Sequence, residues 1–414
     1  MCEPPTHFLL VLARAAVGTL FDSQCSMGKL RLSIAAVVLM LGCSASSASA
    51  YSVLAHEAVI DEAWDREIAP LLRQRFPSAS VDAIRKARAY AYGGSLIQDL
   101  GYYPFGSHLF TNLVHYVRSG DFVQALITDA RTVDEFAFAL GALAHYASDN
   151  AAHPMAVNKA LPIMYPKLRA KYGEDVLFAE SPSRHVMVEF AFDVLQVARG
   201  TFKADTYQDL LGFEVSKPVL ERAFRETYGL ELKDVFGDVD LAINTYRHAA
   251  SKLIPDVTRV AWREKRKEIL DATPDVAEAN VVYTMTPADY DKKYGTNYRK
   301  PGLLARFVVA VFKVLPKFGP FRPLAFEPLT TQTERMFLDS FDASCERYRV
   351  LLRAVRERRL SFADTDLDTG RPPSPGVNQL ADKTYADLLN KLTKKKVVIP
   401  VALRQNGQNG VRPR

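Results

Sequence analysis

Histidines and acidic residues form a spaced series between His56 and Glu189 that is suited to binding metal ions. The whole chain has eight histidines, and five of them belong to this series. Its members are His56, Asp99, His115, His145, Asp149, His153, His185 and Glu189. Imidazole nitrogens and carboxylate oxygens are ligands that suit zinc. Because eight side chains are too many for one tetrahedral ion, the series predicts a cluster of two or three ions.

Two pairs in the series have the spacing that places side chains on one face of a helix. His145 precedes Asp149 by four residues, and His185 precedes Glu189 by four. Both pairs lie in otherwise apolar segments, where a buried carboxylate without a partner costs several kcal/mol. A metal ion removes that cost by pairing the charge. The alternative is a set of buried histidine–carboxylate hydrogen bonds without metal.

Helical periodicity dominates the chain and strand signals are scarce, so we expect an all-α protein. Helices that would position the series are expected over 56–76, from 81 towards Tyr92, over 112–118, over 133–149 and from Ser183 onwards. Residues 99–104 are predicted to form a loop, and residues 150–154 are predicted to end the long apolar helix. Later helices are expected over 217–227, 239–270, 302–315, 331–358 and 376–393.

The N-terminal segment has the pattern of a secretory signal peptide. Over 27–50, a short basic stretch precedes an apolar run and then small residues that end in Ala48-Ser49-Ala50. We therefore expect residues 1–26 to lie upstream of the true start, cleavage before Tyr51, and export to the periplasm or the medium. The alternative is a lipoprotein anchored at Cys43. The apolar run is too short for a permanent membrane anchor.

The chain contains four cysteines, of which only Cys345 would remain after that cleavage. A single thiol forms no internal disulfide, so stability must come from the core and from metal. Cys345 lies in a helical pattern and is expected to be buried. The formal net charge of +6 favours anionic partners without selecting one class.

The sequence lacks the motifs of several other catalytic and metal-binding sites. His56-Glu57 is followed by Ile60 where a zincin would have a second histidine, and no G-x-S-x-G elbow or P-loop occurs. The segment from Asp364 to Gly370 is similar to a calcium loop, but its glycine comes one position late and Pro375 occupies the place of the bidentate glutamate. We expect a capped turn there.

The histidine–carboxylate series resembles that of the zinc-dependent phospholipase C family. These are all-α bacterial enzymes that hydrolyse phosphatidylcholine-like lipids, and S1/P1-type nucleases share their fold. The resemblance covers roughly residues 51–199. It implies a multi-helix phospholipase C/P1 nuclease-like domain with a helical C-terminal extension.

The resemblance also implies a ligand set for three zinc ions. One ion would be held by Asp99, His115, His145 and Asp149. A second would be held by His153, His185 and Glu189. The third would be held by the α-amino and carbonyl groups of Tyr51, by His56 and by the bridging Asp149. His108 is the alternative to His115, which we prefer because its distance from Asp99 is nearer to that in the family.

The sequence departs from the family pattern at two of these positions. The family usually begins its mature chain with tryptophan, whereas this chain has Tyr51, whose backbone would supply the ligand atoms. The family's histidine after His-x-x-x-Asp lies six residues past the aspartate, whereas His153 lies four past Asp149. We therefore expect a tighter turn before His153.

The expected activity is phosphodiester hydrolysis by a metal-activated water, with phospholipid headgroups as the substrate. Asp99 would orient or deprotonate the nucleophile. The first alternative is a secreted nuclease with nucleic acid as the substrate, for which Tyr102, Tyr103, Phe105 and Phe110 could stack bases. The second is an exported protein that has structural zinc and no enzyme activity. The sequence indicates no oligomeric state.

The chain from Tyr51 onwards is predicted to have three parts. Residues 51–200 would form the zinc-binding catalytic region. Residues 201–393 would form a helical extension that completes or flanks it, and residues 394–414 a basic disordered tail. Within the extension, residues 302–321 are apolar with a few basic side chains, so peripheral membrane contact is one interpretation and a core helix the other.

Overall fold

A computed structural model describes residues 53–199, 214–250, 254–273 and 326–396. Among these residues there is no β-strand, and only Asp366 and Arg371 form an isolated bridge. The α-helices are α3 (Val53–Ala63), α4 (Ala69–Arg75), α5 (Val81–Ser95), α6 (His108–Tyr116), α7 (Ser119–Asp129), α8 (Val133–Ala152), α9 (Asn158–Met164), α10 (Pro166–Tyr172), α11 (Pro182–Arg199), α13 (Lys217–Tyr228), α14 (Val239–His248), α15 (Ile254–Ala272), α18 (Thr331–Arg356) and α19 (Gln379–Lys395). The prediction of an all-α protein is confirmed.

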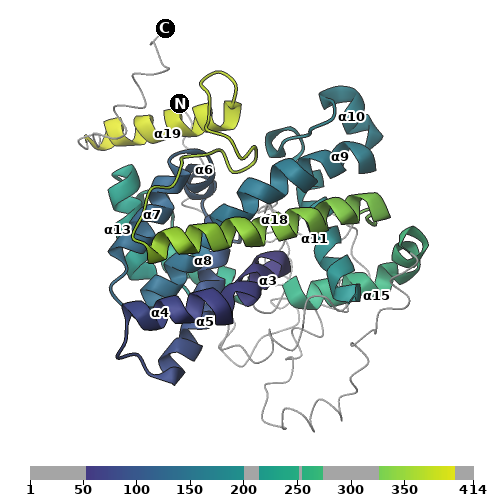
Figure 1. The fold of residues 1–414 in the computed structure, drawn as a ribbon. Helices are drawn as coiled ribbons and strands as arrows, with labels where there is room; N and C mark the ends of the chain where they lie inside the picture. Colours follow the sequence, from purple (N-terminus) through teal and green to yellow (C-terminus); the bar gives the residue numbers. More distant parts are fainter. Residues whose placement is uncertain (1–52, 200–213, 251–253, 274–325, 397–414) are drawn as a thin grey trace, which may run out of the picture.

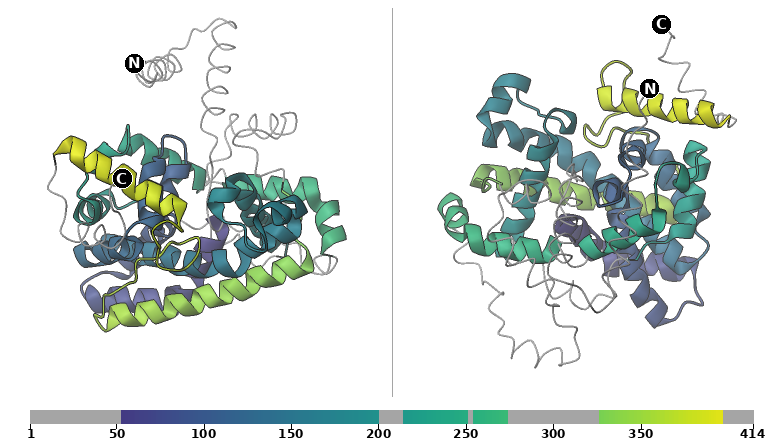
Figure 2. Two further views of the ribbon diagram at one scale, coloured as in Figure 1. Left: turned by 90° about the horizontal axis from the view of Figure 1, so that it is seen from above. Right: turned by 180° about the vertical axis from the view of Figure 1, so that it is seen from behind.

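Helix α8 lies at the centre of the described structure. Nearly all of its residues are buried, which is the pattern of a helix that is surrounded by others. It contacts α5 on one side and α18 on another. Figure 1 shows α18 running alongside α8, with α3, α4 and α5 grouped below them. In the view from above, α18 forms one edge of the molecule (Figure 2). A polar side chain on α8 therefore needs an internal partner.

Helices α5 and α8 approach each other closely because two glycines face the partner's backbone. A Cβ atom on Gly94 would lie 2.0 Å from the carbonyl oxygen of Phe138, and one on Gly141 would lie 2.0 Å from that of Ala91. Only a hydrogen atom fits in either place. The close approach brings the end of α5 against the face of α8 that carries His145.

Replacing Gly141 with alanine is expected to lower the free energy of unfolding by about 1–3 kcal/mol. An exposed helical glycine would gain stability from this change, but here two backbones must move apart. Urea unfolding measures the effect. Gly237→Ala is the matched control, because a Cβ there meets no atom within 4 Å. Equal stability of the two variants would contradict the close approach.

The helix that carries His115 begins earlier than predicted. It is α6, and Ser107 caps its first turn by accepting a hydrogen bond from the backbone N–H of Phe110 at 3.2 Å. The expected loop over 99–104 is also partly wrong, because Ile97–Tyr102 forms a 3-10 helix that includes Asp99. The hydroxyl of Thr111 supports this helix by bonding both the N–H of Gly101 and the carbonyl of Gln98.

The α-helical part of the long helix ends at Ala152, within the predicted range 150–154, but the helical path does not stop there. Helix α8 continues into a π-helical turn over His153–Val157 and then into α9. Pro154 has no N–H to donate to the preceding turn, and at this point the chain forms a π-helical turn in place of an α-helical one. No tighter turn precedes His153. It follows Asp149 by one further turn of a continuous helix, on the same face as His145.

The remaining expected helices lie close to their predicted positions. The segment 56–76 is α3 and α4 joined by a π-helical turn over Trp64–Ile68, and Ser80 caps α5 as predicted. The segment 239–270 contains two helices, α14 and α15. Lys394 and Lys395, predicted to be disordered, belong to α19. The predicted leader and the expected helix over 302–315 lie outside the described residues.

The described C-terminal part returns to the N-terminal helices. Cys345 on α18 is buried as predicted, and burial raises the pKa of its thiol to about 12. After α18 the chain passes over α7 and α6, and α19 then packs on α6 (Figure 1). Among the described helices we find none that combines the length and the apolar character required to cross a bilayer.

Candidate metal centre

The described members of the histidine–carboxylate series meet in one buried place, although they come from six helical segments. His56 lies on α3, Asp99 on the 3-10 helix and His115 on α6. Helix α8 supplies His145 and Asp149, the π turn supplies His153, and α11 supplies the last pair. None of these side chains is more than slightly exposed. They form three groups, and the candidate ligand atoms of each group lie within 4.8 Å of one another. The groups are His56, His145 and Asp149; Asp99, His115 and His145; and His153, His185 and Glu189.

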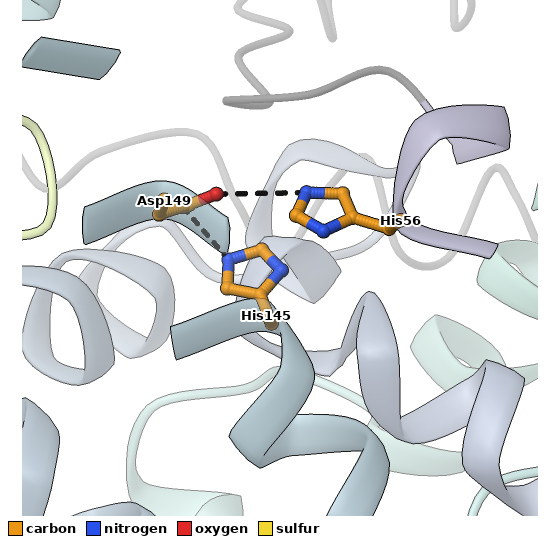
Figure 3. Close-up of side chains that lie close together, drawn as sticks. All are labelled: His56, His145 and Asp149. Carbon is orange, nitrogen blue, oxygen red and sulfur yellow. Dashed lines mark ion pairs between the residues drawn. The ribbon is translucent and has the colours of Figure 1, made fainter. Parts of the chain in front are cut away.

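The carboxylate of Asp149 is the common point of the centre. Its Oδ2 lies 3.0 Å from Nε2 of His145 and 3.5 Å from Nε2 of His115. Its Oδ1 lies 3.6 Å from Nε2 of His56, whose ring stacks on that of His145 at 4.4 Å. Figure 3 shows both histidines directed at this carboxylate. Asp149 therefore faces two of the groups at once, as a bridging ligand must.

Backbone carbonyls fix the orientation of three of the rings. Nδ1 of His145 lies 2.9 Å from the carbonyl of Ser95, and Nδ1 of His115 lies 2.9 Å from that of Thr111. Because a carbonyl only accepts hydrogen bonds, each Nδ1 must carry the proton. Nε2 is then the nitrogen that faces the centre in both rings. The two Nε2 atoms lie 3.3 Å apart, with Asp99 3.4 Å from that of His115.

The third group uses the opposite ring nitrogen of its helical histidine. Nε2 of His185 lies 2.8 Å from the carbonyl of Val176, so it is the protonated atom, and Nδ1 faces Glu189 Oε1 at 3.6 Å. His153 lies beside them, with its ring centroid 5.5 Å from that of His185. Its Nε2 points back towards Asp149 at 3.9 Å. This group thus adjoins the other two through Asp149.

Burial keeps several of these histidines neutral. Burial, with the neighbouring His145, lowers the pKa of His56 to about 3, and burial also lowers the pKa of His153 to about 4 and that of His185 to about 3. Neutral imidazole is the form that binds metal. Burial acts the same way on His115, but the carboxylates of Asp149 and Asp99 outweigh it and raise its pKa to about 10. A cation entering there must displace that proton.

The residues present fit divalent cations. Both oxygens of Asp149, both oxygens of Glu189 and Nδ1 of His185 are buried without a hydrogen-bond partner. Burial, together with the nearby Asp99 and Asp149, raises the pKa of Glu189 well above its usual range. Several buried carboxylates in one place are costly unless a positive charge is added. The donor set of imidazole and carboxylate is the set that zinc prefers.

Comparison with known families agrees with this donor set. Residues 55–238 match the family model described as zinc dependent phospholipase C. This region is a zinc-dependent phospholipase C domain. No match was found among curated proteins or among solved structures. The matched region holds all eight side chains of the series, and it extends beyond the resemblance seen in the sequence, which ended near Arg199.

The phospholipase C domain is a hydrolase by its family, and zinc is its cofactor. The structure brings together every predicted side-chain ligand. It differs from the predicted grouping in two respects. His145 belongs to the group of His56 as well as to that of Asp99, and Asp149 belongs to the group of His56 but not to that of Asp99. The ligand roles themselves, and that of Tyr51, which lies outside the described residues, stay predictions.

Replacing His115 with alanine is expected to remove one metal ion from the phospholipase C domain and to lower kcat by at least about 100-fold. Loss of a residue that only hydrogen-bonds a metal ligand already costs about 10–100-fold, and His115 is expected to bind the metal directly. His108→Ala is the matched control from the same helix. The ring of His108 is exposed and lies beside Tyr102, 5.9 Å between centroids. Metal analysis and initial rates measure both. A larger loss for His108→Ala would reverse the choice between them.

Of the four aromatic residues considered for substrate stacking, Tyr102 has its ring beside a ring of the centre. The ring of Tyr102 is 6.4 Å from that of His115 and 6.0 Å from that of Phe178. Phe110 is fully buried among core rings, and Tyr103 packs on Tyr246. The phospholipase C domain thus has Tyr102 and Phe178, both half-buried, as an aromatic wall.

Sequence reasoning missed one acidic residue at the centre. The segment 364–370 does form the predicted capped turn, in which Asp366 accepts hydrogen bonds from the backbone N–H groups of Asp368 and Thr369. Asp368 is buried, and its Oδ1 lies 3.3 Å from Nδ1 of His153. Burial, with the neighbouring Asp366, raises the pKa of its carboxyl to about 8. No spacing rule links a residue so distant in sequence to the series.

Proposed function

We propose that this protein hydrolyses the phosphodiester bond of phospholipid headgroups at the centre around Asp149. The carboxylate of Asp149, within 4 Å of four histidine rings, is the observation that carries this proposal. One carboxylate with two oxygens facing different groups can hold two cations close together. Close cations are the arrangement that phosphodiester hydrolysis uses.

The residues of the centre would have separate roles in binding metal, orienting the rings and excluding water. Asp149 and the inner nitrogens of the histidines would hold zinc, and Glu189 would complete the third group. Zinc held there supplies a Lewis acid for a phosphoryl oxygen and lowers the pKa of water towards neutrality. The carbonyls of Ser95, Thr111 and Val176 keep the rings from turning. The aromatic wall would exclude water beside the reacting phosphate.

Asp99 would be the residue that orients the attacking water or accepts its proton. It is fully buried on the 3-10 helix and faces Nε2 of His115 at 3.4 Å. Asp99→Asn is therefore expected to lower kcat by more than it lowers metal content, by about 100-fold or more at full occupancy. Initial rates and metal analysis of one sample test this. Equal losses would make Asp99 a ligand only.

The substrate class is tested with the zinc-loaded mature protein on two substrates. Phosphatidylcholine vesicles and single-stranded DNA are offered at matched phosphodiester concentration, with and without a chelator. Release of phosphocholine that the chelator abolishes is the expected result. DNA cleavage alone would favour the nuclease, and folded protein that binds zinc but cleaves neither substrate would favour structural zinc.

We further propose that the protein is exported and acts at a membrane surface. The leader pattern over 27–50 and the apolar, basic segment 302–321 support these two proposals respectively. Both segments lie outside the described residues. N-terminal sequencing of the mature protein tests export. Tyr51 as the first residue would also provide the free α-amine that is expected to bind zinc together with His56 and Asp149. A lipid-modified Cys43 would contradict that ligand.

A further inference from the structure

A segment far from the ligand series in sequence lies against the metal centre. We call residues 362–371, between α18 and α19, the C-terminal strap. The hydroxyl of Ser119 bonds the carbonyl of Thr365 at 2.6 Å, and the hydroxyl of Tyr146 bonds that of Ala363 at 2.7 Å. The backbone N–H of Leu367 donates to the carbonyl of His115 at 3.1 Å. The strap is thus attached to α7 and to two of the helices that carry ligand residues, α6 and α8.

Asp366 and Asp368 are the two buried acidic residues of the strap, and the geometry of the strap places the carboxylate of Asp368 at a defined position. Gly370 has a φ of +67° and lies so close to the C-terminal part of α8 that a Cβ would be 2.7 Å from the carbonyl of Asn150. Asp368 Oδ2 accepts a hydrogen bond from the N–H of Phe178 at 2.8 Å, and its backbone carbonyl accepts one from Asn158 at 2.8 Å. Its other oxygen, Oδ1, faces His153.

The ring of His153 therefore lies between two carboxylates. Nδ1 is 3.3 Å from Asp368, and Nε2 is 3.9 Å from Asp149. This arrangement differs from that of His115, His145 and His185, whose outer nitrogens bond backbone carbonyls. A carboxylate at the outer nitrogen fixes the tautomer and makes the inner nitrogen a stronger donor to metal.

We propose that Asp368 is a positioning residue that orients His153 and strengthens its bond to the metal of the third group. Asp368 lies beyond the region 55–238 that matches the family, so the C-terminal part of the chain completes the centre. The inference rests on the proposed role of His153 as a ligand. Its consequence is a metal site whose affinity depends on the strap.

The test is Asp368→Asn, which keeps the shape of the side chain. An amide has one accepting oxygen, whereas the carboxylate accepts from the N–H of Phe178 and, in this inference, faces a protonated Nδ1 of His153. The NH2 of the asparagine must therefore face either the N–H of Phe178 or Nδ1 of His153. In the second case it stabilises the tautomer whose Nδ1 carries no proton, which is the wrong one for binding metal through Nε2. We expect one zinc per chain to bind about 10–100-fold more weakly, while the other ions are retained.

Competition with a chromophoric chelator measures zinc affinity in the full mature chain. Asp364→Asn is the control, because it removes the same charge from the same strap and its carboxylate accepts from the N–H of Asp121 rather than facing a histidine. Wild-type affinity in Asp368→Asn, or an equal loss in the control, would overturn the inference. Wild-type protein that binds no zinc would instead overturn the proposed function.

A second measurement does not depend on how well the variant folds. In zinc-loaded wild-type protein, the 15N shifts of His153 should report a protonated Nδ1 and a metal-bound Nε2. Metal bound through Nδ1 would overturn the inference, because Asp368 would then face the ligand atom itself. Apo protein supplies the reference shifts for the unbound ring.

Discussion

Asp149→Asn is expected to abolish hydrolysis and to remove most of the bound zinc. The carboxylate lies within 4 Å of a nitrogen of His56, His115, His145 and His153, so its charge supports every group at once. Breaking a buried charge pair costs roughly 3–5 kcal/mol. A loss of that size in transition-state stabilisation lowers kcat/KM by roughly 150- to 5,000-fold. Metal analysis and initial rates on phosphatidylcholine check both parts.

The matched control for Asp149→Asn is Asp134→Asn, an identical change in the first turn of the same helix. Asp134 is half-exposed and remote from the ligand-bearing turns of α8. Its variant should retain full zinc content, and its rate should stay within about twofold of wild type, as surface changes usually do. If Asp149→Asn retained all of its zinc, the carboxylate could not be the common ligand of the centre.

Removal of metal by a chelator is expected to destabilise the protein as well as to inactivate it. Without cations, Asp149 and Glu189 are buried carboxylates whose oxygens lack hydrogen-bond partners. An ion present at about 1,000 times its Kd adds roughly 4 kcal/mol to the folded state. For a protein of this size that corresponds to a fall in Tm of about 5 °C per tightly bound ion removed.

Calorimetry with and without chelator measures this shift. Addition of excess zinc should restore both Tm and activity, whereas addition of magnesium should restore neither, because it prefers oxygen ligands. The double variant His185→Ala, Glu189→Ala lacks two ligands of the third group. Chelator should therefore lower the Tm of this variant by less than it lowers the Tm of wild type. An unchanged Tm after complete removal of zinc would show that the buried acids are stabilised in another way.

The sequence was sufficient for those parts of the site that depend on helical periodicity. The four-residue spacing of His145 and Asp149 determines that both lie on one face wherever that segment is helical. The apolar surroundings of both pairs made their burial predictable, and buried acids require a compensating charge. The same reasoning identified α5, α11, α13, α18 and α19 close to their observed bounds.

Predictions failed where a local signal was outweighed by its context. Pro154 is normally a sign that a helix has ended, and the four-residue spacing from Asp149 led us to expect a tighter turn before His153. In the structure the helical path continues through a π turn at Pro154, which has no N–H to donate to the turn before it. The glycine-mediated approach of α5 to α8 was also not predicted, because no periodicity shows which backbone a glycine will face.

The sequence by itself determined the class of the protein, the donor set and the spacing of its ligands along each helix. Those properties follow from residue types and from the 3.6-residue repeat, which are local. Only the tertiary structure decided which donors share a group, which ring nitrogen faces the centre, and that Asp368 lies against His153. These depend on contacts between segments up to about two hundred residues apart, and such contacts are set by packing, which no local pattern encodes.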